Sequence, residues 1–146
     1  MTQKDKELLI KDLCARLPYG VKAYVKNWSK LDRKYYEGVY TVESIHPSLN
    51  NILVSSERFS VEVIVGYDDY EIQPYLFPLS SMTEEQRKEY DSIIYHNVEL
   101  HADRYYEVID VDSFELLHDF YHKNHLDYRG LIPMDLAIDC TNLNIY

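Results

Sequence analysis

A change in hydrophobic period near residue 20 constrains the fold of this chain more than any other feature. Up to Leu17, apolar side chains recur every three or four residues, which is typical of an amphipathic helix over residues 2–17. From Val21 onward the period becomes two, the spacing of strands that bury one face. The strands after the first are expected at residues 35–45, 51–55, 59–65 and 70–75. The sequence therefore predicts a helix followed by about five strands.

Short polar segments separate these strands and favour an antiparallel arrangement. They are rich in asparagine, proline, serine, glycine and aspartate, which form tight turns. Strands joined by such short turns usually pair with their neighbours in sequence. Residues 21–76 are therefore expected to form a small antiparallel sheet, or a barrel if the sheet closes.

The C-terminal half has the pattern of helices. One helix is expected to begin at a capping box and to run to about residue 95. Two pairs have the required spacing: Ser81 with Glu84, and Thr83 with Gln86. A second helix is expected to begin at Asp112-Ser113 and to end near Asn124. Its apolar side should consist of Phe114, Leu117, Phe120 and Tyr121.

Two remaining segments are assigned less directly. Residues 96–111 fit no single period, although 105–111 favour a strand, and residues 133–138 favour a short helix. The sequence contains no repeat and no linker. The whole chain, residues 1–146, is therefore expected to be a single α+β domain, with a helix at 1–17, antiparallel strands at 21–76 and a mainly helical segment at 80–146.

The start of the chain, its apolar stretches and its cysteines indicate the cellular compartment. The charged start of the chain lacks the apolar region of a signal peptide, and no apolar stretch approaches the ~20 residues of a membrane-spanning helix. Cys14 and Cys140 form no C-x-x-C motif, so reduced thiols are expected. We therefore expect a cytoplasmic protein with no membrane partner.

Acidic side chains outnumber basic ones and are unevenly placed. The chain has 25 Asp and Glu against 15 Lys and Arg, a net charge of −10. Residues 1–38 carry a net +4 and residues 39–146 a net −14. There are also 15 tyrosines, whose rings and hydroxyls suit half-wet interfaces. This composition disfavours non-specific binding to nucleic acid and permits a basic protein partner.

No catalytic motif stands out. The sequence has no G-x-S-x-G, no P-loop and no G-x-G-x-x-G, and it contains four glycines in all. Cys14 falls on the apolar side of the first helix, where a thiolate nucleophile is not expected. We therefore assign no catalytic residue and no cofactor.

The first strand carries a candidate nucleic-acid site on its solvent-facing side. Lys22, Tyr24, Lys26 and Trp28 alternate cations with rings on one face, as single-strand-binding sheets do. The same alternation also fits an ordinary solvated strand. Nucleic-acid binding is therefore an alternative function, opposed by the charge of the whole chain.

A histidine cluster gives a second alternative. His118 and His122 are four residues apart on one helix face, and His125 follows in the next turn. Three imidazoles can hold a metal ion. The helix contains no H-E-x-x-H motif, so this pattern alone does not define a metalloenzyme.

Two longer stretches carry a family resemblance. Residues 73–86 read QPYLFPLSSMTEEQ and residues 119–132 read DFYHKNHLDYRGLI. They resemble signatures of a family of small hypothetical proteins from gut anaerobic bacteria, their phages and integrated elements. Gln73 and Phe77 stand where that family has basic residues. The resemblance covers residues 70–138 and implies a phage- or mobile-element-associated accessory protein.

The second stretch contains a turn with two interpretations. Arg129 can pair with Asp127 or with carbonyls at a helix end, which would dock the turn on the core. Alternatively, Asp127, Tyr128 and Arg129 form a partner-binding loop. With no catalytic motif and an acidic, tyrosine-rich surface, our leading hypothesis is a non-enzymatic protein-interaction module that acts on a host or phage protein.

Overall fold

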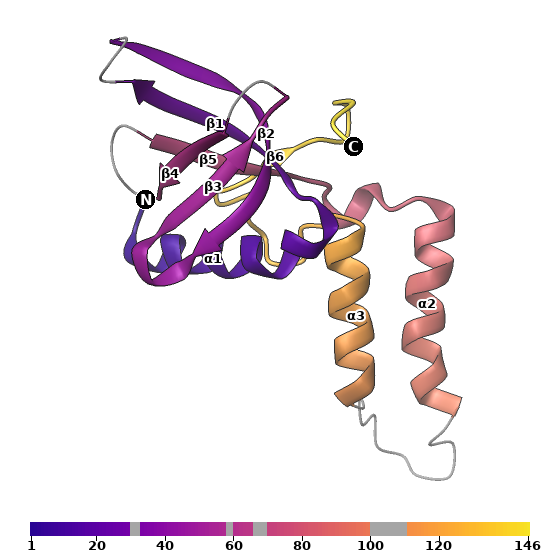
Figure 1. Cartoon of the computed structure of the whole chain (residues 1–146). Helices are drawn as coiled ribbons and strands as arrows, with labels where there is room; N and C mark the ends of the chain where they lie inside the picture. The colour runs from indigo at the N-terminus through magenta and orange to yellow at the C-terminus, as the bar shows by residue number, and fades with distance from the viewer. Residues whose placement is uncertain (30–32, 58–59, 66–69, 100–110) are drawn as a thin grey trace.

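The computed structural model describes residues 1–29, 33–57, 60–65, 70–99 and 111–146, and it confirms the α+β fold (Figure 1). An N-terminal helix precedes a six-stranded sheet, and two long helices follow. The elements in chain order are α1 (Gln3–Arg16), η1 (Leu17–Tyr19), β1 (Lys22–Ser29), β2 (Lys34–His46), η2 (Pro47–Leu49), β3 (Asn51–Ser55), β4 (Ser60–Ile64), β5 (Tyr70–Leu76), η3 (Leu79–Ser81), α2 (Glu84–Glu99), α3 (Val111–Lys123) and β6 (Ile138–Asp139).

Strands β1 to β4 form an antiparallel meander, β5 pairs antiparallel with the other edge of β1, and β6 pairs in parallel with β5. The order of the sheet is β4-β3-β2-β1-β5-β6, so β1 lies inside the sheet and pairs with both β2 and β5. The five predicted strands are confirmed. Strand β6 was not predicted, because its two residues are too few to show a period. It pairs in parallel with β5, beside the hydrogen bond from Cys140 N to Leu76 O at 3.0 Å.

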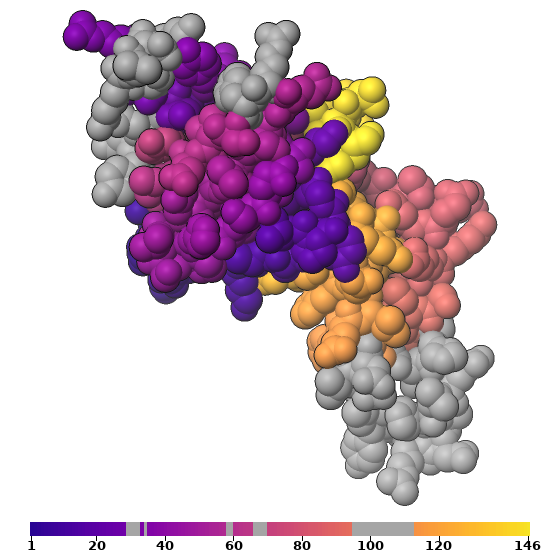
Figure 2. Space-filling model, viewed as in Figure 1, coloured from indigo at the N-terminus to yellow at the C-terminus, as the bar shows by residue number. Residues whose placement is uncertain are grey.

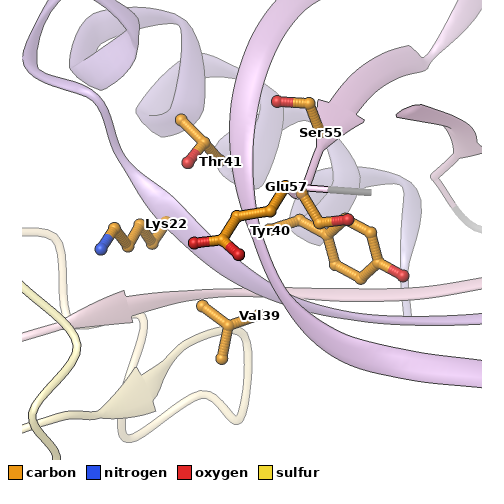
Figure 3. Close-up of a pocket in the computed structure, with 7 residues that line it drawn as sticks. Lys22, Val39, Tyr40, Thr41, Ser55 and Glu57 are labelled. Atoms are coloured by element: carbon orange, nitrogen blue, oxygen red, sulfur yellow. The ribbon is translucent and has the colours of Figure 1, made fainter. Parts of the chain in front are cut away.

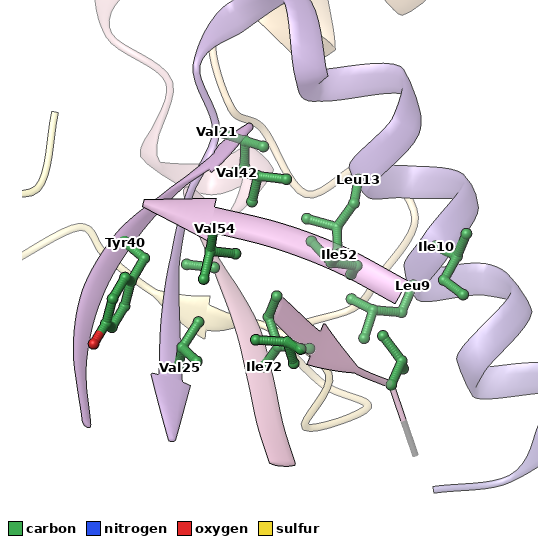
Figure 4. Packing of buried hydrophobic residues seen from close by; sticks show 13 residues of the cluster. Leu9, Ile10, Leu13, Val21, Val25, Tyr40, Val42, Ile52, Val54 and Ile72 are labelled. Atoms are coloured by element: carbon green, nitrogen blue, oxygen red, sulfur yellow. The ribbon is translucent and has the colours of Figure 1, made fainter. Parts of the chain in front are cut away.

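Helix α1 covers one face of the sheet and closes the main core (Figure 4). Leu9 and Leu13 are fully buried, and the alternating residues of the strands meet them from the other side. The strands contribute Val21, Val25, Tyr40, Val42, Ile52, Val54, Val63 and Ile72 to this cluster. The two periods in the sequence therefore correspond to the two layers of the core.

Local chemistry sets the ends of α1. The Thr2 hydroxyl accepts a hydrogen bond from Asp5 N, and the Asp5 carboxylate accepts one from Thr2 N at 2.7 Å. After α1, the turn η1 ends at Gly20, whose φ of 65° is left-handed and suits glycine. This turn redirects the chain into β1.

Helices α2 and α3 form a hairpin that projects from the side of the body (Figure 1). The predicted choice of caps is resolved in favour of Thr83 and Gln86, which exchange hydrogen bonds between side chain and backbone. Gln86 also donates to the Asn124 side chain at 3.0 Å, and the Tyr90 ring lies 6.0 Å from that of Phe120. These contacts fasten the two helices together near their base.

Two predicted elements, at residues 105–111 and 133–138, are not found as predicted among the described residues. The strand expected at residues 105–111 lies outside the described residues except for Val111, with which α3 begins. The short helix expected at residues 133–138 was wrong, because this segment forms turns and the first residue of β6. Asp135 has a φ of 59°, which is incompatible with a right-handed helix.

A buried ion pair joins α1 to the C-terminal half. Arg16 donates to both carboxylate oxygens of Asp12, at 2.7 and 3.1 Å, and neither side chain is exposed. The same guanidinium donates to Tyr121 O and Leu126 O at the end of α3. Arg129 donates to Asp12 as well, at 3.1 Å. This network positions the base of the hairpin against the sheet.

We expect Asp12→Ala to lower the free energy of unfolding by about 3–5 kcal/mol, because it leaves the Arg16 guanidinium buried without its counter-ion. Urea unfolding measures this loss. The double variant Asp12→Leu, Arg16→Met should lose less, since no buried charge remains unpaired. Lys88→Ala is the control, because its pair with Glu84 is exposed and should contribute less than about 1 kcal/mol. A small loss in Asp12→Ala would contradict the role of the network.

Candidate functional site

The four β1 residues proposed for nucleic acid share the solvent-facing side of the sheet with acidic neighbours. Glu37 and Glu71 lie opposite Lys26 on the two flanking strands. Lys22 is already engaged, since its ammonium donates to Ile145 O at 2.6 Å. The Tyr24 hydroxyl donates to Glu37 at 2.9 Å. The carboxylates beside Tyr24 and Lys26 reduce the attraction of this face for phosphates.

Part of the predicted cluster does come together at the far end of the β1–β2 hairpin. The Trp28 and Tyr35 rings lie 4.8 Å apart, and the Lys26 ammonium lies 5.0 Å from the centre of the Tyr35 ring. Tyr35 is 53% exposed. Sequence reasoning missed Tyr35, although its place opposite Trp28 follows from the hairpin register. The structure therefore groups Lys26 and Trp28 and separates them from Lys22.

An open depression of about 380 Å³ lies beside this face (Figure 3). It is lined by Lys22, Val39, Tyr40, Thr41, Ser55, Ser56 and Glu57. Lys22 and Glu57 bring opposite charges to it, but the Lys22 ammonium is held by the C-terminal segment. The depression does not enclose a ligand, and we assign it no role.

The three histidines proposed for a metal do not converge. The His118 and His122 rings stack with centres 6.1 Å apart, and His122 Nε2 lies 2.9 Å from the Tyr128 hydroxyl. His125 instead stacks on Tyr146 with ring centres 3.9 Å apart. Across the described part of the chain, no three His, Cys, Asp or Glu side chains are placed to hold a metal ion.

His125 has a structural role that the sequence did not reveal. Its φ of 52° is left-handed, and it ends α3 where glycine is usual, with Leu126 N donating to Tyr121 O and His125 N to His122 O. Its ring is buried, and Nδ1 has no hydrogen-bond partner within the described residues. Burial, with the Arg16 and Lys22 cations nearby, lowers the pKa of His125 to about 4.

The predicted turn at residues 127–129 is largely structural. The Asp127 carboxylate accepts hydrogen bonds from Leu131 N and Ile132 N, both at 2.8 Å. Arg129 pairs with Asp12 of α1 rather than with Asp127. The predicted alternatives for Arg129 did not include this partner, because nothing local in the sequence brings residues 12 and 129 together. The turn is therefore docked, but through Asp12 and the Asp127 carboxylate rather than through the pairings expected for Arg129.

Tyr128 belongs to a row of rings along α3, which we call the α3 aromatic row: Phe114, His118, Tyr121 and Tyr128. Tyr121 and Tyr128 stack in near-parallel planes with centres 4.8 Å apart. His118 lies 5.5 Å from Tyr128 and 6.5 Å from Phe114. The Arg129 guanidinium lies 4.7 Å from the Tyr128 ring. The row runs from the base of the hairpin outward along α3.

The outer part of this row is exposed. Phe114 is 47% exposed and His118 is also exposed. Leu116, which is 57% exposed, is two residues from Phe114 and lies on another face of α3. Figure 2 shows that α2 and α3 extend away from the sheet, which leaves this stretch of α3 uncovered on the visible face. The sequence predicted an apolar side here but not that part of it would face solvent. Exposed apolar groups beside acidic side chains are typical of interaction surfaces.

Comparison with known proteins gives no further guide: no family model, no curated protein and no solved structure matches this chain. Within the described residues, no helix has the length and apolar character needed to cross a bilayer.

We expect the stability of the protein to fall as the pH is lowered from 6.5 to about 4. His122 and His125 have a pKa of about 4 in the folded state against an ordinary 6.5, mainly because both are buried. The unfolded chain therefore binds protons first, so stability is complete above pH 6.5 and is lost below it. Urea unfolding at pH 7 and pH 5 measures the difference.

His125→Asn tests the origin of this loss. Asparagine tolerates the left-handed φ at this position and does not titrate in this range. The variant should therefore lose less stability between pH 7 and pH 5 than the wild type. An unchanged loss would assign the pH dependence to groups other than His125.

Proposed function

We propose that this protein is a non-enzymatic interaction module that binds a protein partner through the outer part of the α3 aromatic row. The observation that carries the proposal is the exposure of Phe114, and of His118 one turn further along, on a helix that stands away from the body. A helix in contact with water alone carries polar side chains at such positions. Burying the Phe114 ring against a partner would remove apolar surface from water.

The surrounding charge supports a basic partner. Residues 84–123, which contain the hairpin, carry eleven acidic side chains against four basic ones. Glu115 and Asp119 follow Phe114 on α3. An acidic rim around an apolar centre steers a positively charged protein surface and repels nucleic acid. The resemblance of residues 73–86 and 119–132 to the phage-associated family supports a host or phage protein as the partner.

Nucleic-acid binding through Lys26 and Trp28 has less support. One cation lies on the Tyr35 ring there, but Glu37 and Glu71 lie next to it in the sheet. A metal-dependent reaction has less support still, because His125 is turned toward Tyr146 and away from the other two histidines. The interaction module therefore remains our leading proposal.

Affinity capture from host lysate tests the proposal. The tagged wild type should retain a partner at a constant ratio, with or without nuclease. Phe114→Ser should reduce the retained amount at least tenfold, because it replaces the exposed ring with a polar side chain. Leu49→Ser is the matched control, since Leu49 is equally apolar and 68% exposed but lies in η2.

Two outcomes would contradict the proposal. Equal capture by the wild type and Phe114→Ser would remove the aromatic row as the contact surface. Capture that nuclease abolishes, and that Lys26→Glu also abolishes, would favour the nucleic-acid alternative. Urea unfolding of each variant should match that of the wild type, so that lost capture does not reflect lost folding.

A further inference from the structure

We propose that this protein assembles head to tail, with the far end of the β1–β2 hairpin of one copy docked on the α3 aromatic row of the next. This inference rests on the proposed function, because it identifies one partner of the row as a second copy of the chain. It follows from two exposed surfaces that bring opposite charges and exposed aromatic rings.

The first surface is the β1–β2 arm, which we define as residues 26–29 and 33–39. Beyond Asn27, β1 pairs with β2 alone, and β2 pairs with β3 only from Thr41 onward. The arm therefore extends past the rest of the described sheet (Figure 1). Its exposed rings and cations include Tyr35 and Arg33. Residues 26–37 carry four basic and two acidic side chains, which makes this the basic end of an acidic chain.

The second surface is the outer part of the α3 aromatic row with its acidic neighbours. Phe114 and His118 supply exposed rings, and Glu115 supplies an exposed carboxylate. The segment 84–123 carries a net charge of −7. An arm with a net charge of +2 and exposed aromatic rings therefore complements the exposed rings of this surface, its Glu115 carboxylate and the acidic hairpin that carries them.

The protein itself shows the chemistry by which such surfaces bind. Lys26 lies over the Tyr35 ring, and Arg129 lies over the Tyr128 ring at 4.7 Å. Cations over aromatic rings therefore stabilise both the arm and the base of the hairpin from within. A docked arm would add the same kind of contact between copies, with Arg33 near the exposed ring of Phe114 or His118.

The placement of the two surfaces sets the symmetry. The arm and the α2–α3 hairpin lie at opposite ends of the molecule (Figures 1 and 2). The arm of one copy therefore cannot dock on the aromatic row of the same copy. Because the two surfaces differ, a single contact between two copies leaves one free arm and one free row. Further contacts of this kind build open chains or rings, and the smallest ring is a pair whose arms and rows dock reciprocally.

Sedimentation of purified protein tests the proposal. The weight-average mass of the wild type should rise with concentration in about 0.05 M salt and return to that of one chain in about 1 M salt, because salt screens the opposite charges. Nuclease treatment beforehand excludes assembly on a nucleic acid. A single-chain mass at all concentrations in low salt would overturn the inference.

A pair of variants makes the test specific. The arm variant Lys26→Glu, Arg33→Asp reverses two charges, and aspartate tolerates the left-handed φ of 52° at position 33. The row variant Phe114→Lys, Glu115→Lys places two cations on the exposed side of α3, where lysine is a good helix former. Each variant alone should have the mass of one chain. Mixed in equal amounts, they should form a two-chain species and nothing larger, because each retains the surface that the other lacks.

The remaining outcomes are equally clear. Lys11→Glu and Glu7→Lys change charges on the exposed side of α1 and should leave assembly intact. Assembly by either double variant alone would overturn the inference, as would a mixture that stays at single-chain mass while the wild type assembles. If the wild type never assembles but still captures a partner that Phe114→Ser loses, only the head-to-tail inference fails and the proposed function stands.

Discussion

The buried pair of Asp12 and Arg16 is the interaction on which the arrangement of this molecule depends. Removing two charges from water is costly, and the cost is offset only when every donor and acceptor finds a partner. Arg16 meets this requirement through Asp12 and two carbonyls at the end of α3, where a cation is also favoured by the helix dipole. The pair therefore determines which end of α3 lies against α1 and from which side the hairpin projects.

The two stretches for which the sequence suggests a family resemblance, residues 73–86 and 119–132, meet at this same place. Phe77 and Leu126 form a parallel bridge, with hydrogen bonds from Phe77 N to His125 O and from Asp127 N to Phe77 O. Gln86 reaches Asn124, and Gln73 donates to Asp135 O. These two stretches therefore form the structural base of the hairpin. The exposed outer part of α3 precedes the second stretch, so the surface proposed for binding lies outside both.

Sequence periodicity predicted the layers of this fold because each layer buries one face of a regular element. The five strands, the Thr2 cap and the choice between two capping boxes all depend on neighbours within a few residues. Arg129 and His125 show where such reasoning ends. The partner of Arg129 is 117 positions away. His125 has a left-handed backbone where glycine is usual, and its ring stacks on Tyr146, which is also distant in the sequence. Periodicity also placed Phe114 on an apolar side, but only the packing of α2 and α3 decides how much of it faces solvent.

The Asp12–Arg16 network also imposes an order on folding. Its hydrogen bonds to Tyr121, Leu126 and Arg129 span 105, 110 and 117 positions in the chain. The strands of the meander, by contrast, join through short turns and can pair soon after they are synthesised. The leucine side of α1 can therefore pack on the sheet early in folding, while Asp12 and Arg16 are still hydrated. These two side chains lose their water only when the end of α3 arrives, so the seating of the hairpin is the step that completes the core.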